Sequence, residues 1–120
     1  MIEMITDLPD NVVGFTAKGT ITAKDYESII MPAVEKLFSR HDKGRFLYVL
    51  GDEFSGFEAG AMWDDTKLGL KHLTGWEKIA VVSDVEWVLA SVRLFGLAIP
   101  GHVRIFHQRD QAEATHWIAE

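Results

Sequence analysis

The 120-residue chain contains no cysteine, three prolines and no long apolar run. The lack of cysteine excludes disulfides, thiolate metal sites and cysteine nucleophiles, and it favours a reducing, cytoplasmic location. The longest apolar candidate, 85–99, is interrupted by Glu86 and Arg93 and falls short of the ~20 residues that a membrane span needs. No basic-then-apolar leader opens the sequence, so we expect no signal peptide. The sequence predicts a cytoplasmic protein with no transmembrane segment.

Clustered positive charge is also missing. The 12 Lys and Arg are scattered and outnumbered by 18 Asp and Glu, which gives a formal charge of −6. Binding to nucleic acid through charge needs a basic patch, so we expect no nucleic-acid partner. The glycines form neither a Gly-x-Gly-x-x-Gly nor a P-loop pattern, which removes dinucleotide and P-loop functions.

Known catalytic and metal-binding patterns are absent as well. The five histidines form no His-x-x-x-His pair, and Ser55 is not in a Gly-x-Ser-x-Gly elbow. Four carboxylates belong to one region of the chain: Asp52, Glu53, Asp64 and Asp65. They could hold a divalent cation, but ordinary solvent-facing charges are the favoured interpretation. We therefore expect no metal, no cofactor and no enzymatic activity.

Strands and helices alternate along the chain. The predicted strands cover 1–6, 11–21, 46–50, 78–82 and 102–107. Helical spacing follows at 22–43, 57–73, 83–97 and after Asp110. The order ββαβαβαβα predicts a single α/β domain over 1–120, with a mostly parallel five-stranded sheet, an antiparallel edge hairpin and four helices.

Three local signals refine this scheme. Thr22 with Asp25 resembles a capping box at the start of the first helix, and Ser83 with Glu86 does so for the third. Pro32 lies inside the first helical pattern and predicts a kink, or two short helices, around 30–32.

The segment 51–57 is predicted to be a loop between the third strand and the second helix. In open α/β sheets, sites tend to lie just past the carboxyl ends of the strands, which is where this segment falls. Ser55 and Gly56 are expected to cap the helix that follows. The segment is therefore the first candidate site.

The third predicted helix has almost no polar face, whereas a surface helix normally has one. The candidate surface for an apolar ligand or a dimer partner consists of Trp63, Trp87, Val88, Leu94 and Phe95. Coverage of this helix by its neighbours remains an equal alternative.

The element order and four segments, 19–26, 67–73, 79–82 and 114–118, resemble the SpoIIAA-like group, also called STAS/SEC14-type proteins, of the STAS-domain superfamily. The resemblance covers essentially the whole chain. It implies a STAS-like fold and a non-enzymatic regulatory or interaction domain, with a protein partner docking around 52–57 and the second helix.

The resemblance also implies two kinds of site. In the anti-sigma antagonists of the superfamily, the loop reads Asp-Ser-Ser/Thr-Gly and the residue before Gly accepts phosphate. That position corresponds to Ser55 in a switch segment made of Asp52, Glu53, Phe54, Ser55 and Gly56, where Phe54 and Glu53 depart from the pattern. The SEC14-type likeness implies, as the alternative, a carrier or sensor of a small apolar ligand or lipid near the second and third helices.

Overall fold

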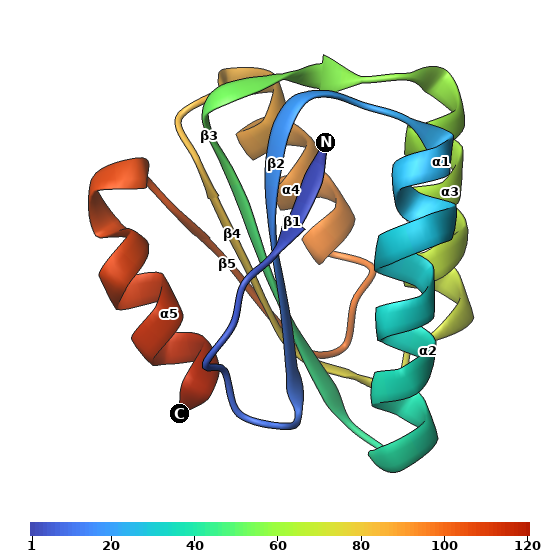
Figure 1. The fold of residues 1–120 in the computed structure, drawn as a ribbon. Helices are drawn as coiled ribbons and strands as arrows, with labels where there is room; N and C mark the ends of the chain where they lie inside the picture. The colour runs from blue at the N-terminus through green and yellow to red at the C-terminus, as the bar shows by residue number, and fades with distance from the viewer.

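The five strands lie in the sheet in the order in which they occur along the chain (Figure 1). The computed structural model describes residues 1–120. Its strands are β1 (Ile2–Met4), β2 (Val12–Ile21), β3 (Gly44–Phe57), β4 (Trp76–Ser83) and β5 (His102–Phe106). β1 pairs antiparallel with β2, and all other pairs are parallel. The predicted α/β fold class, with an antiparallel edge hairpin, is confirmed.

Four helical stretches cover the sheet. The first combines α1 (Ala23–Asp25), a π-helical turn η1 (Tyr26–Ile30) and α2 (Met31–Arg40). The others are α3 (Ala59–Lys71), α4 (Glu86–Gly96) and α5 (Gln111–Ala119), which follows a 3-10 turn η2 (Gln108–Asp110). Figure 1 shows α1, α2 and α3 on one side of the sheet and α5 on the other. Right-handed crossovers that all use one face place the parallel strands in consecutive order.

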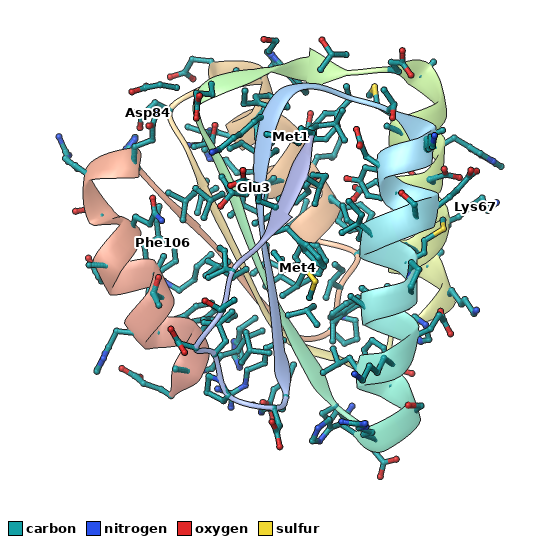
Figure 2. All side chains as sticks on the ribbon, in the orientation of Figure 1. Met1, Glu3, Met4, Lys67, Asp84 and Phe106 are labelled. Carbon is teal, nitrogen blue, oxygen red and sulfur yellow. The ribbon has the colours of Figure 1, made fainter.

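Each face of the sheet has its own core. Along β3, Phe46, Tyr48 and Leu50 belong to the larger cluster of 18 buried residues, while Leu47 and Val49 belong to a second cluster of eight. Alternate residues of a strand point to opposite faces, so β3 is buried on both sides, as its unbroken apolar run predicts. α5 covers the smaller cluster. The side chain of Phe106, the last residue of β5, belongs to this cluster and lies on the side of the sheet that faces α5 (Figure 2).

The first helical stretch begins as predicted. The Asp25 backbone N–H donates to Thr22 Oγ1 at 3.1 Å, and the Thr22 N–H donates to Asp25 Oδ2 at 2.8 Å, which completes the capping box. The kink or break expected around Pro32 takes another form. The backbone stays helical through Met31, and a π-helical turn precedes the proline, which sits in the first turn of α2. Proline is tolerated there because the N–H it lacks would have few helical partners.

The predicted cap of the third helix is wrong. Ser83 is fully buried and still pairs with Leu50 in the sheet, so the helix begins later, after the N-cap Val85. The Ser83 hydroxyl oxygen instead accepts the Val85 backbone N–H at 3.1 Å. A residue held in the sheet cannot also start the helix, because its backbone is committed to strand pairing.

The largest correction concerns the segment 51–57, which is strand and not loop. Phe54, Gly56 and Phe57 pair with Gly19, Thr20 and Ile21 of β2 after a register shift. Gly19 has a φ of +65° at that irregularity, as residues in β-bulges often do. Figure 1 shows this end of β3 running over the top of the sheet towards α3.

Candidate ligand-binding site

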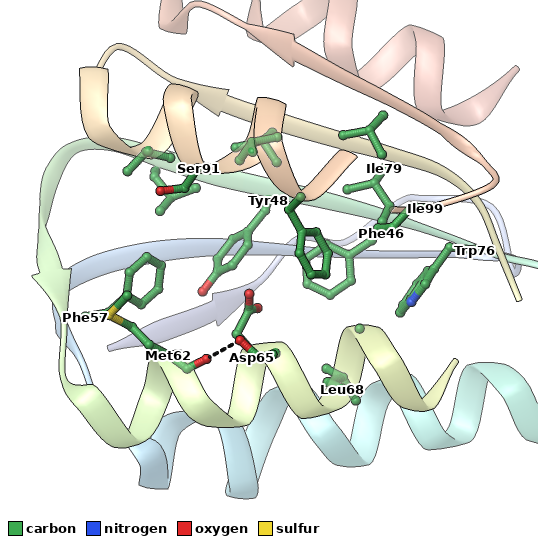
Figure 3. Close-up of a pocket in the computed structure, with 18 of the residues that line it drawn as sticks. Phe46, Tyr48, Phe57, Met62, Asp65, Leu68, Trp76, Ile79, Ser91 and Ile99 are labelled. Atoms are coloured by element: carbon green, nitrogen blue, oxygen red, sulfur yellow. Dashed lines mark hydrogen bonds between the residues drawn. The ribbon is translucent and has the colours of Figure 1, made fainter. Parts of the chain in front are cut away.

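A cavity of about 260 Å³ lies between α3, α4 and the face of the sheet opposite α5 (Figure 3). Of its 19 lining residues, 15 are hydrophobic, so its walls are largely apolar. The sheet contributes Phe46, Tyr48, Leu50, Phe57, Trp76, Ile79, Val81 and Val103. An engineered cavity of about 150 Å³ holds benzene, so this one has room for about ten non-hydrogen atoms.

The helical walls of the cavity are formed by residues spaced three and four apart, which lie on one side of a helix. On α3, Met62, Asp65, Thr66 and Gly69 recur at spacings of three and four residues, and they line the cavity as one stripe. A second stripe, Ala61, Asp64 and Leu68, is buried, and its Leu68 also lines the cavity. α3 therefore has two inward-facing sides.

The corresponding stripe on α4 consists of Trp87, Val88, Ser91, Val92 and Phe95. A Cβ added at Gly69 would lie 2.6 Å from Phe95 Cζ, so the glycine makes room for this ring between the helices.

One end of the cavity is polar. The hydroxyls of Tyr26 and Tyr48 lie 2.9 Å apart, and the Tyr26 hydroxyl donates to Asp65 Oδ1 at 2.9 Å. Tyr26 is fully buried and Tyr48 is 6% exposed. The side chains of Tyr48 and Asp65 point into the cavity from opposite walls (Figure 3). Three side chains from η1, β3 and α3 thus form one hydrogen-bonded chain.

The electrostatic setting of this chain is unusual. Burial raises the pKa of Asp65, and the hydrogen bond from Tyr26 opposes that rise only in part. Asp65 nevertheless keeps an exposed surface and lines the cavity, so its carboxylate lies where the cavity meets solvent. No lysine, arginine or histidine lies within ion-pair distance of its carboxylate. Burial also raises the pKa of Tyr26 and of Tyr48, so both phenols stay protonated.

The structure divides the apolar candidates from the sequence into two groups. Trp87, Val88 and Phe95 line the cavity. Trp63 and Leu94 do not, and they are 64% and 74% exposed. The predicted surface is therefore two surfaces, one inside the cavity and one on the outside of the helices.

The switch segment is held at the end of β3. Asp52 Oδ1 accepts a hydrogen bond from Gln108 Nε2 at 3.0 Å, and Glu53 lies 3.5 Å from Lys18 Nζ. Phe54 is 9% exposed, and its ring packs against Phe57 and Trp87. The burial of Phe54 explains why the segment 51–57 forms a strand and not a loop.

Within that strand end, Ser55 is exposed and Gly56 has a φ of +151°. The predicted helix cap at these two residues is wrong, because the N-cap of α3 is Glu58. The helix dipole favours a phosphate only in the first turn of a helix, and Ser55 lies outside that turn of α3. Its role as a phosphoacceptor stays a prediction.

The four carboxylates do not come together. Asp52 and Glu53 lie on the outside of β3, whereas Asp64 is 4% exposed and Asp65 faces the cavity. The expectation that Asp64 and Asp65 both face solvent is wrong for Asp64, which α3 buries, whereas Asp65 is exposed and also lines the cavity. No three His, Asp or Glu side chains are placed to hold a metal ion.

The polar chain was missed as a site by sequence reasoning. The sequence feature that could have indicated it is a tyrosine, which carries a hydroxyl, at an otherwise apolar position. Tyr26 is such a residue in the first predicted helix, and Tyr48 in the third predicted strand. The pairing with Asp65 joins residues 39 positions apart, which periodicity alone does not show.

The helices of the structure are too short or too polar for any of them to cross a bilayer. A comparison with curated proteins found no match. Among solved structures, the chain is similar to an uncharacterised protein of the DUF3478 family from Shewanella loihica PV-4, which has a SpoIIAA-like fold. The TM-score is 0.74 at 27% identity, over 98% of this chain and 92% of that one. The SpoIIAA-like family model matches residues 12–119, and the chain therefore belongs to the SpoIIAA-like family.

Proposed function

We propose that the protein is a non-enzymatic binding domain, a carrier or sensor of a small, mostly apolar ligand held between α3 and α4. The observation that supports this proposal is the cavity of about 260 Å³ with largely apolar walls. Ligand pockets in proteins typically combine such walls with a few polar groups that orient the ligand. Tyr48 and Asp65 supply those groups here.

An entrance is available between the helices. Met62 on α3 and Trp87 on α4 line the cavity, and they are also 53% and 46% exposed. Side chains that border both the cavity and the solvent mark its mouth. A ligand can therefore enter by displacing two side chains, without unfolding of either helix.

Octan-1-ol is a suitable probe, because its eight-carbon chain matches the space. We expect isothermal titration to show binding by the purified chain. Ser91→Phe should abolish binding, since it places a ring into the cavity from α4. Ala90→Phe adds the same ring one residue earlier, at an exposed position outside the lining, and should bind as the wild type does.

Circular dichroism would first establish that both variants fold. Equal affinity of the two variants for octan-1-ol would contradict binding in this cavity. Native mass spectrometry of detergent-free protein adds a second readout, since a tightly held natural ligand would appear as retained mass.

Interaction with another protein is the second candidate function, and it is supported by side chains outside the cavity. Trp63 on α3 and Leu94 on α4 are exposed, as is Leu97, at 85%. Exposed tryptophans often carry much of the binding energy in interfaces. We propose that this outer surface forms a homodimer, which is the commonest use of an apolar patch.

Sedimentation velocity tests this second proposal. The wild type should sediment as a dimer, and Leu94→Glu should sediment as a monomer, because the variant places a charge on the patch. A monomeric wild type at high protein concentration would refute the dimer. Binding of octan-1-ol should be unaffected by Leu94→Glu, so the two proposals fail or stand separately.

A further inference from the structure

The oxygen atoms of the cavity side chains share one property: they can accept hydrogen bonds, and the hydroxyl protons are already donated within the protein. With Asp65 as a carboxylate, the Tyr26 hydroxyl proton goes to Asp65 Oδ1. The contact of 2.9 Å between the two phenols then requires Tyr48 to donate to Tyr26. Tyr48 and Asp65 therefore present only acceptor oxygens to the cavity.

The two aliphatic hydroxyls on the helices follow the same rule. Thr66 Oγ1 donates to the Met62 carbonyl at 3.0 Å, and Ser91 Oγ donates to the Trp87 carbonyl at 2.8 Å. Both protons thus stay within the turn that carries them. A ligand that meets these hydroxyls finds lone pairs and no free proton.

Two indole N–H donors remain in the lining, those of Trp76 and Trp87. Trp87 is 46% exposed and belongs to the mouth of the cavity, and the N–H group of Trp76 is out of reach. The indole Nε1 of Trp76 has no hydrogen-bond partner, but its accessible surface is below 1 Å². The ring packs edge-on against Phe38 and Phe46. A ligand in the cavity therefore contacts the indole ring but not its N–H group.

We infer that the ligand is a small cationic amphiphile, a primary amine with an apolar body, whose ammonium group binds Asp65 and Tyr48 at the polar end of the cavity. The inference rests on the proposed function, since it specifies the ligand of the same site. An ammonium carries three donors and no acceptor, which complements the acceptor oxygens of Tyr48 and Asp65 at the polar end of the cavity. A carboxylate or phosphate head would meet lone pairs and the Asp65 charge.

The charge of Asp65 supports the same choice. The Asp65 carboxylate pairs with no cation of the chain, and its exposed position in the cavity lining leaves it open to a cation from a ligand. Its only hydrogen-bond donor is the neutral hydroxyl of Tyr26. An ammonium ion at hydrogen-bond distance would supply the missing cation, and the low polarity of the walls would strengthen that contact.

Three probes with the same eight-carbon chain test the inference: octylamine, octan-1-ol and octanoate. We expect the wild type at neutral pH to bind octylamine at least about tenfold more tightly than octan-1-ol, as one added charged hydrogen bond would give. Octanoate should bind most weakly. This comparison needs no variant, so it does not depend on the folding of a mutant.

Two variants sharpen the result. Asp65→Asn removes the charge at nearly constant shape and should lose the preference for octylamine while it still binds octan-1-ol. Ser91→Phe fills the cavity and should abolish binding of all three probes. Octylamine that still binds Ser91→Phe with wild-type affinity would be bound to the acidic surface, which overturns the inference.

The outcomes separate the inference from the proposed function. Binding of octan-1-ol as tightly as octylamine, or a preference for octanoate, overturns the inference and leaves the apolar-ligand proposal intact. An undiminished preference for octylamine in folded Asp65→Asn also overturns it. Failure of all three probes to bind overturns both.

Discussion

Replacing Phe54 by alanine tests whether the end of β3 is packed strand. The side chain is 9% exposed, and its ring centroid lies 5.0 Å from that of Phe57 and 6.0 Å from that of Trp87. Truncation of a buried phenylalanine destabilises proteins by about 3–5 kcal/mol. Trp87 is 46% exposed and can move into the vacated space, so we expect a value near the lower limit, about 3 kcal/mol.

For a chain of this length, that loss corresponds to a fall in melting temperature of roughly 12 °C. Urea unfolding followed by circular dichroism gives the free energy directly. Ser55→Ala is the matched control, because Ser55 is the exposed neighbour in the same strand and its change should stay within about 0.5 kcal/mol. A loss below about 1 kcal/mol for Phe54→Ala would refute the packed strand and favour the loop that the sequence predicts.

Three further predictions concern other parts of the chain. Burial raises the folded-state pKa of Asp65 above its usual 3.8, so its contribution to stability is full below that pH and is lost as pH rises through the folded value. The unfolding free energy of Asp65→Asn relative to wild type should therefore increase with pH from about 3.8 upwards and then level off; a difference that does not change with pH would contradict this. Thr22→Ala removes the capping box and should lower stability by about 1 kcal/mol in urea unfolding, while no change would show that the cap is not formed in solution. Gly19→Ala places a side chain at a φ of +65° with open space around it, so strain alone should cost about 1–2 kcal/mol, and a neutral effect in thermal unfolding would exclude the bulge geometry.

The parts of the fold that the sequence predicted are those with strong local periodicity. The apolar run at Phe46 and Leu50 marks β3 because a strand covered on both faces needs no polar residue. The capping box at Thr22 is equally local, since its hydrogen bonds join residues three apart. Both signals are complete within a few residues, and the structure confirms them. The box predicted at Ser83 and Glu86 is equally local but does not form, because Ser83 is held in the sheet.

The end of β3 was not predictable in the same way. Gly51, Asp52, Ser55 and Gly56 are residues typical of turns, and they outnumber the single buried Phe54 among them. What makes the segment a strand is an irregular pairing with β2 and a contact with Trp87, which is 33 residues away in the chain. These are tertiary contacts, and they override local preference.

The candidate site shows the same limit. An aspartate on a helix is normally assigned to solvent, and Asp65 follows Asp64 in a stretch that also holds Lys67. The packing of α3 buries Asp64 and places the exposed Asp65 in the lining of the cavity. The cavity was predicted in outline, from the apolar character of the third helix, but its polar end depends on residues from three elements.

The sequential order of the strands has a consequence for how the chain is made. A ribosome releases β1 to β5 in the order in which they pair, so the sheet can lengthen strand by strand while each crossover helix covers one face as it emerges. The opposite face, with Leu47, Val49 and Val82, lacks its helical cover until α5 has been synthesised after every strand. The nascent domain therefore passes through a stage with one finished side and one bare apolar side, and the closing helix ends that exposure in a single late step.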